Sequence, residues 1–220
     1  MARRLRIPYP GAIYQVMARG NGRQDMVRDD DDRGRLQREL GRDAVRGAWR
    51  IYAFVILSNP IHLVLKTPQP NRARGMQVFL STSAHARARR HRCGGHLFQG
   101  RSRTEVVEDQ TDLGTVTRAV HRNPVRARGV DHPAAGRWSS SPGSAHRSRR
   151  LEWVASDELL AWWQGELGGS DAARAYRRSV SAGLAEPAES PGRQAYQGWV
   201  LGSGAFVDRV RALVRGQPRR

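Results

Sequence analysis

Two short apolar runs in the middle of the chain, Ile51–Leu57 and Ile61–Leu65, restrict the fold more than any other stretch. Each run is too short for a typical helix and is rich in β-branched and aromatic residues, a composition typical of buried strands. The Ser-Asn-Pro sequence between them predicts a tight turn. We therefore expect a β-hairpin at the centre of a sheet. Because a polar group in a core strand needs a partner, His62 in the second run marks either a structural histidine or a functional site.

The segments around this hairpin predict an α+β domain. Alternation predicts a first strand over Ala12–Ala18, and a short β-branched segment predicts a further strand over 104–107. The acidic run Asp29–Asp32 precedes a helical stripe; we interpret it as a helix cap, and a metal site is the alternative. Helices are also predicted over 74–91 and 111–123, the latter ending before Pro124. This order fits a ferredoxin-like antiparallel sheet with packed helices.

The last third of the chain predicts a small helical extension. Residues 151–168 contain three tryptophans, and segments 171–182 and 204–214 have a helical period. The segment before them is rich in Ser, Gly, Pro and Arg, as linkers are. We expect a domain over 1–138, a linker over 139–150 and a helical C-terminal extension over 151–220.

The charge of the chain favours a polyanionic partner. Lys and Arg number 38 against 20 Asp and Glu, which gives a net charge of +18, and Lys66 is the only lysine. A compositional bias could replace Lys by Arg, but it would not produce the surplus over acids, so nucleic acid is the favoured partner. Cys93 is the only cysteine, which excludes a disulfide framework and fits a cytoplasmic protein. No apolar segment approaches the roughly 18 residues of a membrane span.

Several motifs together resemble one family. Asn59-Pro60-Ile61-His62 lies in the hairpin, and it is accompanied by RIPYPGAIYQVMARGN (6–21), GHLFQGR (95–101), HRNPVRA (121–127) and Trp138-Ser139-Ser140. In order and spacing they resemble the IS200-like, or REP-associated, single-tyrosine transposases of the HUH type. Segments 173–184 and 200–213 are similar to the extension of longer relatives, so the resemblance covers nearly the whole chain. It also implies the ferredoxin-like fold.

The resemblance implies DNA transposition by cleavage and joining of single strands, in which a tyrosine attacks a phosphate beside a divalent ion, Mg or Mn. In the family, two histidines at i and i+2 of the hairpin strand bind the ion. Here Pro60 replaces the first, which leaves His62 and Asn123 as the metal ligands. The nucleophile position, four residues before Asn123, is Ala119. The sequence therefore predicts impaired cleavage. Asn123 could instead bond the backbone at the helix end, and we interpret His121 as structural.

Polar residues after the first and before the last predicted strand are the candidates for DNA contact. They are Arg19, Asn21, Arg23, Gln99, Arg101 and Arg103. Arginine forks suit phosphates and guanine edges, although solvated loop arginines are the alternative interpretation. We expect single-stranded or hairpin DNA as the partner, with a homodimer as an option. A catalytically inactive DNA-binding module or relic is the main alternative. An RNA-binding ferredoxin-like domain is less favoured, because no strand carries the expected aromatic pair.

Overall fold

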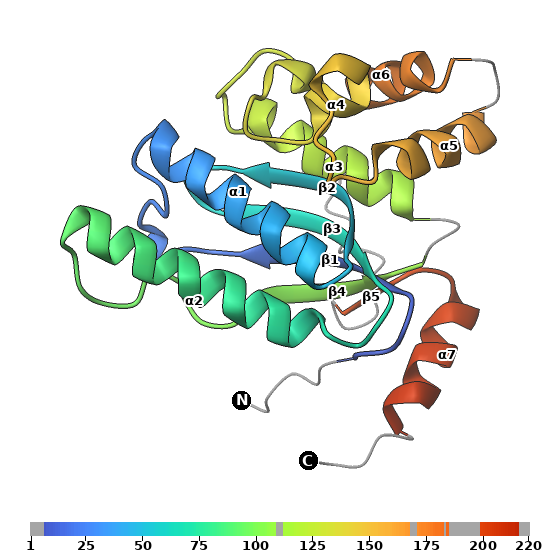
Figure 1. Ribbon diagram of the computed structural model, residues 1–220. Helices are drawn as coiled ribbons and strands as arrows, with labels where there is room; N and C mark the ends of the chain where they lie inside the picture. Colours follow the sequence, from blue (N-terminus) through green and yellow to red (C-terminus); the bar gives the residue numbers. More distant parts are fainter. Residues whose placement is uncertain (1–6, 109–111, 168–170, 183, 185–198, 216–220) are drawn as a thin grey trace.

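The computed structural model describes residues 7–108, 112–167, 171–182, 184 and 199–215. They form a five-stranded mixed sheet with helices on both faces (Figure 1), which confirms the predicted α+β class. The strands are β1 Ala12–Ala18, β2 Arg50–Ile56, β3 Ile61–Thr67, β4 Arg103–Val107 and β5 Val200–Leu201. The helices are α1 Asp30–Arg46, α2 Arg72–His91, α3 Leu113–Arg126, α4 Ser141–Ala145, α5 Ser156–Leu167, α6 Ala172–Ala182 and α7 Gly204–Arg215.

The strand order is β2-β3-β1-β4-β5. The first four strands pair antiparallel, as the ferredoxin-like prediction requires, and β2 and β3 form the predicted central hairpin. The fifth strand, β5, was not predicted; it pairs parallel with β4, so the sheet is mixed. The outer edge of β4 has backbone groups that β1 does not pair, and the segment Trp199–Leu201 forms hydrogen bonds with two of them. Val106 N donates to Trp199 O at 2.7 Å, and Glu108 N donates to Leu201 O at 2.9 Å.

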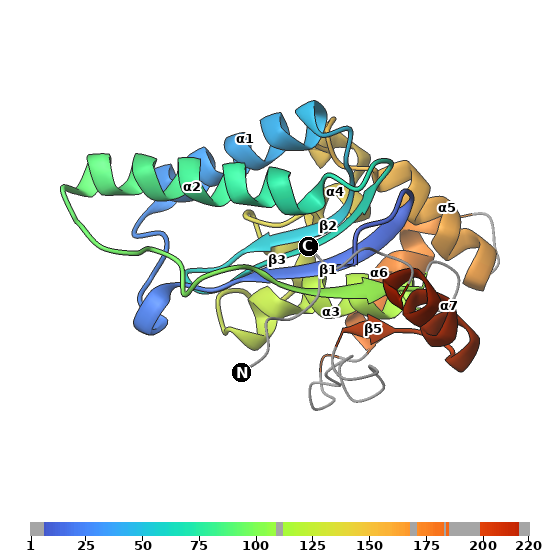
Figure 2. The ribbon, with the colours of Figure 1, turned by 90° about the horizontal axis from the view of Figure 1, so that it is seen from below.

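The sheet separates two apolar cores. Figure 2 shows α1 and α2 on one side of the sheet and α3 on the other. Because successive strand residues point to opposite faces, Val16 and Leu63 join the core under α1 and α2, whereas Ile13 and Val64 join the core under α3. The hairpin is buried on both faces, since Ala53, Phe54, Val64 and Leu65 are all fully buried. This explains the continuous apolar runs in the sequence.

Helix α3 differs from its predicted end. It continues through Pro124 to Arg126, so the expectation that it stops before the proline was wrong. Proline lacks an N–H and disfavours a helix before it, but in the last turn it costs only one backbone hydrogen bond. After the proline the helix is closed by hydrogen bonds from Ala127 N to Asn123 O and from Gly129 N to Pro124 O.

Residues 138–145 lie along the outer edge of β2. Ile56 N donates to Trp138 O at 2.8 Å, and Phe54 N donates to Ser140 Oγ at 2.9 Å. Within the predicted linker 139–150, residues Ser139–Ala145 are buried and include α4. This segment is therefore packed on the sheet. The domain boundaries themselves, 1–138, 139–150 and 151–220, stay a prediction. In the described part of the chain, no helix is long and apolar enough to cross a membrane.

Candidate nucleic-acid interface

Two loops far apart in the sequence are held together beyond the end of β1. Gln99 N donates to Arg19 O at 2.9 Å, and Asn21 N donates to Leu97 O at 2.9 Å. Between these bonds, Gly20 and Phe98 form an antiparallel bridge. The backbone thus continues the pairing of β1 beyond β4. This pairing brings the two predicted groups of DNA-binding residues to the same end of the sheet.

Asn59 of the hairpin turn clamps the first of these loops. Its Oδ1 accepts from Gly20 N at 3.1 Å, and its Nδ2 donates to Gln24 O at 2.9 Å. Sequence reasoning used Asn59 only as part of a motif and missed this role. An asparagine in a tight turn, whose side chain can bond nearby backbone, was the available signal, but its partner loop is almost 40 residues away.

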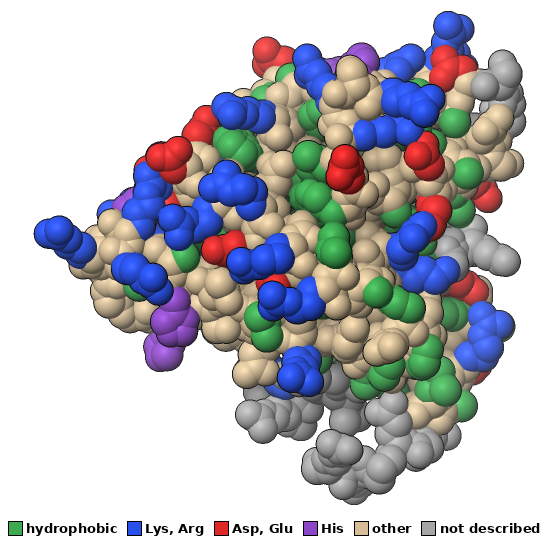
Figure 3. Space-filling view, in the orientation of Figure 1, with side chains coloured by type: hydrophobic (Ala, Val, Ile, Leu, Met, Phe, Trp, Pro, Cys, Tyr) green, Lys and Arg blue, Asp and Glu red, His purple; other side chains and the backbone are tan. Residues whose placement is uncertain are grey.

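A groove of about 1310 Å³ lies between α2 and residues 95–104. Of the predicted DNA-binding residues, four line it: Arg19, Gln99, Arg101 and Arg103. The α2 wall is largely apolar, with Met76, Leu80 and Ala84, and includes Arg72 and His85. No Asp or Glu of the described residues lines this groove. On the face formed by α1 and α2, by contrast, a few acidic side chains lie among the basic ones, and those of the two helices all belong to α1 (Figure 3).

The other two candidates differ from these four. Asn21 is exposed in the clamped loop but does not line the groove. Arg23 belongs to the same turn, Asn21–Arg23, and its side chain lies outside the described residues. The structure therefore places four predicted residues in one groove and a fifth beside it. Their contact with DNA stays a prediction.

His62 lies on the sheet face that is turned toward α3. It is opposite Met17 of β1 and Val55 of β2, and Val55 belongs to the core under α3. Burial, and to a smaller extent the charge of Arg19, lower the His62 pKa to about 4. The imidazole is therefore neutral at pH 7. Its Nδ1 atom is buried without a hydrogen-bond partner among the described residues.

The remaining predicted site residues lie on α3. Ala119 and Asn123 are partly buried and one helical turn apart, next to Val116 and Val120 on the side that packs on the sheet. Among the described residues, His62 Nδ1 has no hydrogen-bond partner, and so none in Asn123. The joint role of His62 and Asn123 as metal ligands stays a prediction. So does the assignment of Ala119 to the position of the family's nucleophilic tyrosine.

His121 has the structural role that its position in the helix predicted. It is fully buried, and its Nε2 bonds Ser140 Oγ at 2.7 Å. Its Nδ1 bonds Tyr176 OH at 2.7 Å, and Tyr176 in turn bonds Ser141 Oγ at 3.0 Å. The network joins α3, the edge of β2 and α6. It occupies both ring nitrogens, so His121 has no free nitrogen for a ligand.

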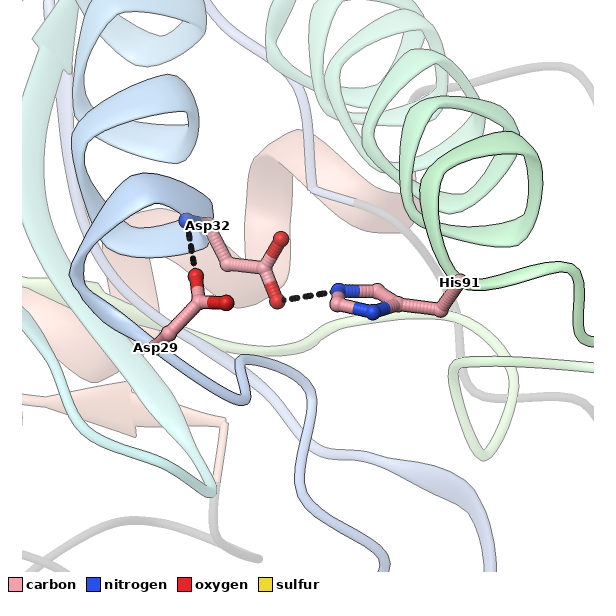
Figure 4. Close-up of side chains that lie close together, drawn as sticks. All are labelled: Asp29, Asp32 and His91. Atoms are coloured by element: carbon pink, nitrogen blue, oxygen red, sulfur yellow. Dashed lines mark hydrogen bonds and ion pairs between the residues drawn. The ribbon is translucent and has the colours of Figure 1, made fainter.

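Asp29, Asp32 and His91 lie close together where α1 begins and α2 ends (Figure 4). Asp32 N donates to Asp29 Oδ1 at 2.9 Å, which confirms the predicted helix cap, and His91 Nε2 lies 2.7 Å from Asp32 Oδ2. Arg90 already supplies the cation: its Nη1 is 2.6 Å from Asp29 and 2.5 Å from Asp32. Hydrogen bonding from Arg90 lowers the Asp29 pKa to about 2. The cluster is an ionic clasp between two helices, and the metal interpretation of this run is not supported.

Of the comparisons with known proteins, only the one with solved structures bears on the fold. No protein-family model matches the sequence, and no curated protein does. Among solved structures, the chain is similar to a REP-associated tyrosine transposase bound to a REP hairpin, with a TM-score of 0.59. The match has 15% sequence identity and covers 69% of this chain and 89% of that chain. The fold is transposase-like. At this identity the similarity shows the architecture alone.

Proposed function

We propose that this protein binds DNA, in single-stranded or hairpin form, through the groove between α2 and residues 95–104. The observation that carries the proposal is the gathering of Arg19, Gln99, Arg101 and Arg103 along one groove without a carboxylate. Guanidinium groups bind phosphate oxygens in a bidentate manner, and the net charge of +18 attracts a polyanion from a distance. The similar solved transposase is bound to a hairpin, which supports the same class of partner here.

We further propose that strand cleavage is impaired. Alanine at position 119 has no hydroxyl that could attack a phosphate, and Pro60 offers no side-chain ligand to an ion. These two positions also favour the alternative function, a module that occupies hairpin DNA without cutting it. DNA transposition rests on the resemblance and a cytoplasmic location on the single cysteine, Cys93; these and a homodimer stay predictions.

One experiment tests binding and cleavage together. The purified chain is incubated with a labelled DNA hairpin, and with an RNA hairpin of matching sequence as the control, in the presence of Mg²⁺ or Mn²⁺. We expect a shifted band for DNA on a native gel and no covalent adduct on a denaturing gel. Absence of any shift at low salt would refute DNA binding. A covalent adduct would show that another residue replaces the missing tyrosine and that cleavage is intact.

The clamped loop gives a sharper prediction, because Gly20 has no room for a side chain. A Cβ at this position would lie 2.4 Å from the Gln24 carbonyl oxygen, so Gly20→Ala must displace loop backbone. We expect Gly20→Ala to weaken hairpin binding about tenfold, since Arg19 moves with the loop and phosphate contacts are lost. Fluorescence anisotropy with a labelled hairpin measures this.

Gly94→Ala is the matched control. A Cβ there would meet nothing within 4 Å, and this glycine precedes the second loop of the same interface. Gly94→Ala should bind as the native chain does. Equal affinities for the two alanine variants would mean that the shape of the clamped loop does not matter for binding.

A further inference from the structure

The arrangement of charges around His62 follows from the strand register. His62 lies opposite Met17 of β1, and Met17 lies opposite Arg103 of β4. Cross-strand neighbours share a face, so the three side chains stand in one row on the α3 side of the sheet. Arg19 is two residues beyond Met17 and, in the direction of β1, comes diagonally beside His62. In agreement with this placement, the charge of Arg19 adds to the effect of burial in lowering the His62 pKa.

The residues in this place do not fit Mg or Mn. These ions prefer several oxygen ligands, above all carboxylates. On this face Glu105 offers a carboxylate in the adjacent row, but Arg103 Nη2 already holds it at 3.1 Å. Pro60 contributes no side-chain ligand. Arg19 is exposed, and no ion pair between it and a described carboxylate is formed, so its charge repels a second cation.

The same features fit an anion. We propose that the His62 face of the sheet binds a phosphate group of DNA through Arg19 and Arg103, in place of a divalent cation. This inference rests on the proposed DNA binding and specifies how one phosphate is held. Both arginines and Met17 also line the groove, whereas His62 does not, so the two arginines are shared between the groove on the α2 side and the row of side chains on the α3 side. A DNA backbone that leaves the groove past these arginines can place a phosphate on the α3 side. Glu105 offsets only part of the charge of Arg103, and Arg19 adds a full positive charge beside it.

Methionine methyl groups report on this place directly. The full chain is labelled with ¹³C at its methionine methyl groups, and their signals are followed by NMR. Met17 lies opposite His62 and reports on the proposed site, whereas Met26 is buried in the core on the other face of the sheet and serves as the reference. Met17→Leu assigns the Met17 signal. Inorganic phosphate, titrated against chloride at equal ionic strength, should shift the Met17 signal and leave Met26 unchanged. Mn²⁺, whose unpaired electrons broaden nearby signals, should leave Met17 as sharp as Met26.

An arginine variant and a control complete the test. Arg19→Ala should abolish the phosphate-induced shift of Met17, whereas Arg74→Ala, which removes an exposed arginine of α2 outside the groove, should retain it. Selective broadening of Met17 by Mn²⁺ would overturn the inference in favour of a metal site. A Met17 signal unmoved by phosphate, or moved equally in Arg19→Ala, would overturn it as well.

The hairpin binding assay separates this inference from the proposed function. Hairpin binding without a phosphate response at Met17 would refute the phosphate site alone. A phosphate response without hairpin binding would refute DNA binding and leave an anion site of another use.

Discussion

His121→Ala is expected to lower the free energy of unfolding by about 3 kcal/mol, because it removes two buried hydrogen bonds and leaves a cavity. His121 is fully buried, with Ser140 Oγ and Tyr176 OH each at 2.7 Å. In the variant, both hydroxyls keep one other hydrogen-bond partner, Phe54 N for Ser140 and Ser141 for Tyr176. The loss of unfolding free energy therefore stays at about 3 kcal/mol. Urea unfolding followed by tryptophan fluorescence measures the change.

The pH dependence of stability distinguishes His121 from an ordinary packing residue. Burial lowers the His121 pKa to about 3, below its value in the unfolded chain. The unfolded state therefore binds the proton more tightly, so this contribution to stability is complete above about pH 6.5 and falls as the pH decreases toward 3. His121→Ala should flatten that part of the profile.

An exposed histidine provides the control. His85→Ala removes a residue whose ring bonds only the Ser81 carbonyl on its own helix among the described contacts, so stability should change by less than about 0.5 kcal/mol. If His121→Ala were as harmless as His85→Ala, the network would not join α3 to α6 in the way that its hydrogen bonds indicate.

The strands and most helix ends were predictable because their signals are local. Ala12–Ala18 has the bounds that alternation predicts, and α2 begins two residues before its predicted start. The strand β5 has only two residues, Val200 and Leu201, which is too short for any period to appear. The Ser- and Gly-rich composition of 139–150 predicted a linker, but Ser139–Ala145 is buried. Small residues also allow close packing, and a Cβ on Gly143 would lie 3.0 Å from Arg150 Cα.

The candidate interface was predictable in its residues but not in its shape. Loop arginines in a basic chain suggested DNA contact, and three of the predicted arginines together with Gln99 line one groove. Its other wall is α2, with Met76, Leu80 and Ala84, and nothing in the sequence indicates that this helix faces residues 95–104 across a groove. The proximity of Arg19 to His62 depends on the register of β1 against β3, which a single sequence does not reveal.

The affinity for a DNA hairpin is expected to fall steeply as the salt concentration rises. The arginines of the groove should account for a calculable part of the slope of log affinity against log salt. Each neutralised phosphate contributes about 0.7 (single strand) to 0.9 (duplex) to the slope of log affinity against log salt. Three contacts, from Arg19, Arg101 and Arg103, contribute about 2 to 2.7 and hence a roughly 20- to 40-fold loss between about 50 and 200 mM salt. Replacing all three by alanine should flatten the slope by this amount, measured by anisotropy over a salt series.

A second triple variant decides whether the effect belongs to the groove or to the charge of the whole protein. Arg38, Arg42 and Arg74 are exposed on α1 and α2 and do not line the groove, so replacing them by alanine removes the same net charge elsewhere. If DNA lies in the groove, this control should lower the affinity slightly through long-range attraction and keep the slope of the native chain. Equal flattening in both triple variants would mean that DNA is held by a diffuse basic surface, and the groove would then have no special role.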